Sequence, residues 1–98
     1  MLKADYERNR NTIDHMITSV YQPVKPSVAQ LNAMSNACAL MKIQNVDERV
    51  INTMAYHIEH PEALVFRDKY TMAALRIARL VIDRKIERME RLGQTCDE

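Results

Sequence analysis

The chain has 98 residues, a formal net charge of +1, one glycine, three prolines and no tryptophan. This length suits one small domain, and a hydrophobic fraction of 47% with nearly balanced charge excludes a disordered chain. A single glycine, against a usual share of about 7%, excludes glycine-rich phosphate loops and turn-rich β-barrels. Composition therefore predicts an all-α protein. We expect one helical domain, residues 1–98, with four to five helices, a long C-terminal helix and a polar tail, residues 93–98.

The sequence also bears on the compartment in which the protein works. Its first 25 residues contain no apolar stretch of signal-peptide length. The most apolar segment, residues 71–82, is interrupted by two arginines and is too short to cross a bilayer. Cys38 lies in an apolar helical pattern and Cys96 in the polar tail, so the two thiols do not indicate a disulfide framework. We expect a cytoplasmic protein with no membrane partner.

The first predicted helix covers residues 2–21, where Tyr6, Ile13 and Met16 follow a helical spacing. Its first two turns are polar apart from Tyr6, so we expect them to project from the body with Tyr6 as an exposed contact residue. The segment ends at a Pro-x-x-Pro run, residues 23–26, which we interpret as a stiff corner. The alternative, a ligand for an SH3-type groove, has little support because this spacing arises often by chance.

The second and third helices are predicted from their capping residues. Ser27 and Gln30 fit a capping box that begins the second helix. Asn45 or Asp47 caps the third helix, and Pro61 follows its end. A helix-turn-helix interpretation of this pair is disfavoured, because the third helix carries one arginine against three acidic residues, which phosphates would repel.

The fourth segment, residues 61–92, is long for a globular helix. Gly93 follows it at the position where a left-handed C-terminal cap is expected. We expect a bend or a break near residues 67–70, where polar residues interrupt the apolar pattern. Between residues 71 and 82 the helix is apolar on nearly all sides, interrupted by Arg76 and Arg79.

A helix that is apolar on nearly all sides is buried from more than one direction. It is either the central helix of the monomer or packs on a second subunit with one of its faces. We favour self-association, most simply a two-fold dimer, because short helices cannot easily cover a rod about 45 Å long. The predicted self-association residues are Leu75, Ile77, Leu80, Val81 and Ile82.

Charge is segregated along the chain although the total is close to zero. Residues 69–92 carry seven Lys or Arg against three acidic residues, whereas residues 44–68 carry two against five. Three interpretations of the basic helix remain. It is a solvated face, a docking surface for an acidic protein partner (a second copy of this chain included), or a nucleic-acid contact. Nucleic acid is the weakest of these, because the pI of 7.8 lies below the value of about 9 typical of such domains. The predicted partner-binding residues are Tyr6, Arg76, Arg79, Arg84, Arg88 and Arg91.

Catalytic and metal-binding patterns are weak in this chain. His57 and His60 share a helix face, but a zinc site needs three or four ligands. We therefore predict no catalytic residue, metal or cofactor. The predicted function is that of a non-catalytic helical interaction protein, an adaptor, inhibitor or regulator of phage or plasmid type, that acts as a homo-oligomer and binds a protein. The alternatives are a nucleic-acid-binding regulator that uses the Arg-rich helix, and a small-ligand-binding protein or enzyme with an Arg/His/Tyr pocket.

Overall fold

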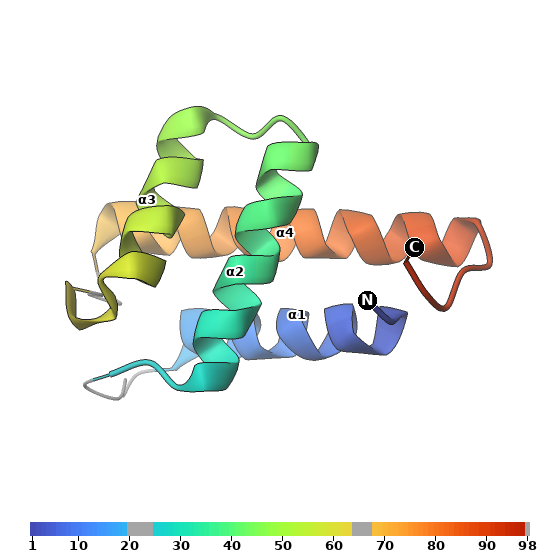
Figure 1. The fold of residues 1–98 in the computed structure, drawn as a ribbon, viewed down its shortest axis with the longest axis horizontal. Coiled ribbons are helices and arrows are strands. Elements are labelled where there is room, and N and C mark those ends of the chain that lie inside the picture. Colours follow the sequence, from blue (N-terminus) through green and yellow to red (C-terminus); the bar gives the residue numbers. More distant parts are fainter. Residues whose placement is uncertain (20–24, 64–67, 98) are drawn as a thin grey trace.

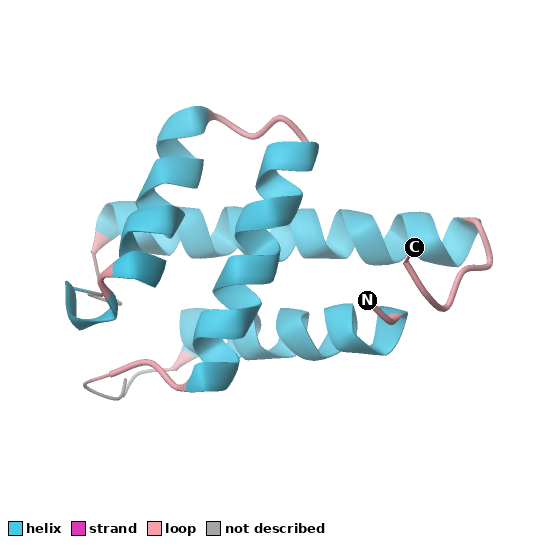
Figure 2. Ribbon diagram, viewed as in Figure 1, coloured by secondary structure: helices cyan, strands magenta, loops and turns pink. Residues whose placement is uncertain are grey.

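The computed structural model describes residues 1–19, 25–63 and 68–97. These residues form four α-helices and one 3-10 helix (Figure 1). The elements in chain order are α1 (Lys3–Thr18), α2 (Val28–Ile43), α3 (Glu48–Glu59), η1 (Pro61–Ala63) and α4 (Lys69–Arg91). The described residues contain no strand, which confirms the predicted all-α class (Figure 2).

Helix α4 is the central element of the bundle. α1 and α4 lie side by side and run in opposite directions (Figure 1). In a second layer, α2 crosses both of them and α3 crosses α4. α4 contacts each of the other three α-helices. Its 23 residues make it about 35 Å long at 1.5 Å per residue, close to the longest extent of the molecule, 39 Å.

The predicted helix starts are confirmed at α2 and α3. The Ser27 amide donates to Gln30 Oε1 at 2.9 Å and the Gln30 amide donates to Ser27 Oγ at 3.1 Å, which completes the capping box. At α3, the Asp47 carboxylate accepts from the Arg49 amide at 2.8 Å, so Asp47 is the N-cap. Asn45 instead ends α2, in a left-handed conformation with φ of 56°.

The C-terminal end of α4 has the cap that the sequence predicts. Gly93 has a φ of 66°, the left-handed region that glycine adopts without strain. The Gln94 amide donates to the Met89 carbonyl at 2.8 Å and the Gly93 amide to the Glu90 carbonyl at 3.2 Å. These two bonds form a Schellman motif, which reverses the chain and directs residues 94–97 back along the bundle.

The fourth predicted segment is two elements, as the expected break suggested. η1 ends at Ala63, and α4 begins at Lys69 with Asp68 as its N-cap. The Asp68 carboxylate accepts from the amides of Tyr70 and Thr71, both at 3.1 Å. Residues 64–67 lie outside the described residues, as does the predicted corner at Pro23. α1 ends at Thr18, three residues before the end predicted for it.

All four α-helices contribute to one hydrophobic core. Its largest fully buried side chains are Ile13, Met16, Met34, Met41, Met54, Thr71, Leu75, Val81, Ile82 and Met89. Because α4 supplies half of these residues, the other helices are arranged around it.

The structure corrects the expectation that one face of α4 is left uncovered by its own chain. Leu75, Val81 and Ile82 are fully buried within the monomer, and Ile77 is partly buried. Of the five predicted self-association residues, only Leu80 is exposed, at 46%. The reason is that α4 is shorter than the rod assumed from the sequence and is flanked by α1 on one side and by α2 and α3 on the other.

Candidate functional site

Three ion pairs join α1 to the basic helix α4. Arg79 contacts Asp14 at 3.0 Å. The other two pairs are Arg10 with Asp83 at 3.7 Å and Lys3 with Glu90 at 3.4 Å. Their spacing follows the antiparallel arrangement of the two helices. Arg79, which the sequence placed among the partner-binding residues, therefore has a contact within its own chain, although it is still half exposed.

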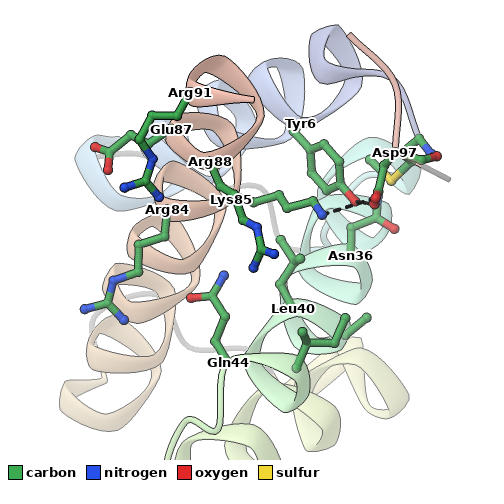
Figure 3. Close-up of a pocket in the computed structure, with 13 residues that line it drawn as sticks. Tyr6, Asn36, Leu40, Gln44, Arg84, Lys85, Glu87, Arg88, Arg91 and Asp97 are labelled. Atoms are coloured by element: carbon green, nitrogen blue, oxygen red, sulfur yellow. Dashed lines mark hydrogen bonds and ion pairs between the residues drawn. The ribbon is translucent and has the colours of Figure 1, made fainter. Parts of the chain in front are cut away.

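A cleft of about 590 Å³ lies between α2 and α4, with Met1 and Asp97 at one end (Figure 3). We call it the basic cleft. Its cationic lining comes from α4: Arg84, Lys85, Arg88 and Arg91. Its apolar lining comes from α2 and the N-terminus: Ala39, Leu40, Ile43 and Met1.

Three of the cleft's cations have no counter-ion among the described residues: Arg84, Arg88 and Arg91. Spacings of four and three residues place them on one face of α4. Figure 3 shows the Arg88 guanidinium directed across the cleft toward Gln44 and Leu40 of α2. The structure thus brings together three of the five arginines that the sequence selected. Arg76 is exposed on α4 but does not line the cleft.

The α2 wall of the basic cleft is mostly apolar and carries two polar side chains, Asn36 and Gln44. Ile43 is 75% exposed there, an unusual position for an isoleucine side chain. Gln44 donates from Nε2 to the Val81 carbonyl at 2.9 Å, which fixes the orientation of its amide. Its Oε1 is buried and has no hydrogen-bond partner among the described residues.

Asp97 closes the end of the basic cleft near the N-terminus. Its carboxylate accepts from the Tyr6 hydroxyl at 2.7 Å and from Lys85 Nζ at 3.2 Å. The hydrogen bond from Tyr6 and that from Lys85 lower the pKa of the Asp97 carboxyl below its usual value. Burial, and then the contact with Asp97, raises the pKa of the Tyr6 hydroxyl above its usual value. The pair is therefore a neutral phenol bound to a charged carboxylate.

Tyr6 corrects a second expectation from the sequence. We expected it to be exposed on a projecting helix, but it is 5% exposed and belongs to the core. The start of α1 does not project, because residues 95–97 pair with residues 1–3 and α4 packs alongside. The Tyr6 ring therefore lies behind Lys85, whose Nζ is 5.9 Å from its centroid.

The histidines lie away from the basic cleft. His57 Nε2 is 2.9 Å from the Thr71 hydroxyl, and His60 contacts Glu62 at 3.5 Å. Burial lowers the pKa of His57, an effect that the nearby Asp68 carboxylate opposes. In the part of the chain that the structure describes, no three His, Cys, Asp or Glu side chains are grouped so that they could hold a metal ion. The Arg/His/Tyr pocket considered from the sequence thus contains Arg and Tyr without His.

Sequence reasoning missed three functional residues of the cleft: Gln44, Lys85 and Asp97. The sequence contained a signal for Lys85, because this residue belongs to the same basic stretch of α4. Gln44 and Asp97 carried no usable signal, because their partners are 37 and 91 residues away in the sequence.

None of the helices built from the described residues combines the length and apolar character needed to span a bilayer. Comparison with known proteins finds no family model, no curated protein and no solved structure that matches this chain.

Proposed function

We propose that this protein is a non-catalytic binding protein whose basic cleft takes an acidic, partly apolar segment of a partner protein. One observation carries the proposal. Arg84, Arg88 and Arg91 face one cleft, have no counter-ion among the described residues, and lie opposite an apolar wall on α2.

The charge of the cleft supports an anionic ligand. Each guanidinium presents a planar set of donors that matches a carboxylate in two parallel hydrogen bonds. Several like charges in one concavity also raise the local potential, which attracts an acidic segment before contact. The exposed Ile43 supplies an apolar surface for aliphatic side chains between the acidic residues of such a segment.

Two features favour a peptide over a nucleic acid. Glu87 and Asp97 line the cleft among its cations and would repel a continuous phosphate backbone. The aromatic ring among the cleft's lining residues, that of Tyr6, is buried and offers no base-stacking face.

The proposal is tested by fluorescence anisotropy with a labelled peptide that alternates aspartate and leucine. Arg88→Gln should weaken binding about three- to tenfold, the effect of one partly exposed charge-assisted contact. Arg76→Gln is the matched control, because Arg76 lies on the same helix, is exposed and does not line the cleft. Its affinity should equal that of the wild type.

Three results would contradict the proposal. Equal losses from Arg76→Gln and Arg88→Gln would show general charge attraction rather than a site. Tight binding of labelled DNA with a steep dependence on salt would favour the nucleic-acid alternative. Binding of free phosphate as strong as that of the peptide would favour a small-ligand site.

A further inference from the structure

The C-terminal tail, residues 93–97, turns at Gly93 and then pairs with the start of the chain through residues 95–97. Leu2 and Cys96 form an antiparallel bridge, and the Lys3 amide donates to the Thr95 carbonyl at 2.8 Å. The Asp97 amide donates to the Met1 carbonyl at 2.7 Å. This backbone pairing acts together with the side-chain contacts of Asp97 to place Asp97 at the end of the basic cleft.

Asp97 provides there the chemistry that the proposed partner would bring. It is an aspartate in an extended segment, and its carboxylate accepts from Tyr6 Oη at 2.7 Å and from Lys85 Nζ at 3.2 Å. Lys85 is therefore the one cation of the cleft that the described chain neutralises itself. The three unpaired arginines lie on α4 on both sides of Lys85, Arg84 before it and Arg88 and Arg91 after it (Figure 3).

We propose that the tail is a built-in competitor of the partner: an acidic segment that enters the basic cleft displaces Asp97 and places its own carboxylate on Lys85 and the Tyr6 hydroxyl. This inference rests on the proposed function of the cleft. Beyond that function, it proposes that the tail regulates ligand binding in the cleft and that the cleft prefers some acidic ligands over others.

The tail is held weakly enough to be displaced. Its residues 93–96 are exposed, and the Lys85 and Asp97 side chains keep 22% and 32% of their surface accessible to solvent. An ion pair at such a position contributes little free energy. The tail nevertheless competes, because a tethered ligand acts at an effective concentration in the millimolar range.

A preference for longer acidic segments follows from this competition. A single carboxylate gains only the contacts with Lys85 and Tyr6 that Asp97 already makes. A segment that also reaches Arg84 and Arg88 gains contacts that the tail does not make, so it can replace the tail. The cleft should therefore discriminate against isolated carboxylates and bind segments that span several residues.

The first experiment measures the labelled aspartate–leucine peptide on the full chain with Asp97→Ala. Affinity should rise about two- to fivefold, the size of one partly exposed ion pair. In a Lys85→Gln background the same substitution should have a smaller effect, because it then frees only the Tyr6 hydroxyl. Glu48→Gln, which removes one negative charge on α3 outside the cleft, is the charge control and should leave affinity unchanged.

The second experiment reports on the tail itself. Cys96 is exposed and Cys38 is buried, so a thiol-reactive fluorophore labels the tail selectively. Addition of unlabelled peptide to the labelled wild type should lower the anisotropy of the fluorophore as the tail is released. In Asp97→Ala the fluorophore should already be mobile without peptide.

The outcomes separate the inference from the proposed function. If the peptide binds wild type and Asp97→Ala equally and the fluorophore stays immobile, the competitor proposal is wrong while the peptide site stands. A gain in affinity that is just as large in the Lys85→Gln background would also overturn it. If the peptide binds neither protein, both proposals fail.

Discussion

At the scale of single residues, His57 has the environment with the clearest pH dependence. Its Nε2 lies 2.9 Å from the hydroxyl of Thr71, which is 2% exposed, and its Nδ1 is buried without a partner among the described residues. Thr71 Oγ1 is also 3.3 Å from the Asp68 carboxylate that caps α4. Protonation of His57 would thus place a charge in a half-buried position at the junction of α3 and α4.

The sign of the pH effect on stability follows from the direction in which the pKa of His57 is shifted. Burial lowers the pKa of His57 in the folded state, with Asp68 as the opposing charge, so the unfolded chain takes up this proton first. The contribution of neutral His57 to stability is complete above the unfolded pKa of about 6.5 and is lost as the pH falls through the folded pKa.

We therefore expect the free energy of unfolding to fall on acidification, and His57→Gln to flatten this dependence. Urea unfolding at pH 7.5 and at pH 5 measures both effects. His15→Gln serves as the control, since His15 is exposed on α1. A variant with His57→Gln that loses as much stability on acidification as the wild type would contradict this assignment.

At the scale of the elements, two Schellman motifs end helices that line the basic cleft. At α2 the motif uses Asn45, with the Val46 amide donating to the Met41 carbonyl at 3.0 Å, and at α4 it uses Gly93. The α4 motif matters more for the site, because it reverses the chain so that Asp97 reaches Lys85.

Gly93→Ala should lower the free energy of unfolding by about 1 kcal/mol, the usual cost of a left-handed alanine. The added Cβ meets no atom within 4 Å, so the cost comes from the backbone alone. Urea unfolding measures it, and Asn45→Gly is the comparison, since glycine is at least as favourable there. No loss in Gly93→Ala would mean that the backbone at this position can relax out of the left-handed region.

At the scale of the whole molecule, α4 accounts for both the stability of the bundle and the surface that is left for association. Leu75 is fully buried where the helices meet, whereas Leu80, five residues further on, is 46% exposed. The same substitution, leucine to alanine, can therefore be compared at a buried and at an exposed position of one helix. Homo-oligomerisation, which the sequence predicts, stays a prediction, with Leu80 as the exposed apolar residue on which it can be examined.

Leu75→Ala should lower the free energy of unfolding by about 2–5 kcal/mol, the range for a leucine truncated in a packed core. Leu80→Ala should stay within about 0.5 kcal/mol, as surface substitutions do. Denaturant unfolding gives both values. Sedimentation at several concentrations then shows whether Leu80 takes part in self-association: a wild-type dimer that Leu80→Ala dissociates would confirm it, and a wild-type monomer would contradict the oligomer prediction.

The helices, their caps and the arginine face of α4 were readable from the sequence. Ser27 with Gln30, Asp47 and Gly93 act through hydrogen bonds to backbone groups a few residues away, and such local geometry is independent of the rest of the fold. Helical spacing likewise sets that Arg84 and Arg88 share a face. This part of the candidate site follows from local periodicity alone.

Only the tertiary structure decided which apolar faces are covered and which charges are left unpaired. Tyr6 is buried rather than exposed, because the tail and α4 pack against α1, and Val81 is covered by its own chain rather than by a second copy. Asp97 reaches Tyr6 across 91 residues of sequence, and Gln44 reaches Val81 across 37. Contacts between such distant residues depend on how the helices pack. Hydrophobic and Coulombic attractions are not tied to a fixed spacing in the sequence, so the sequence pattern does not reveal which distant residues meet.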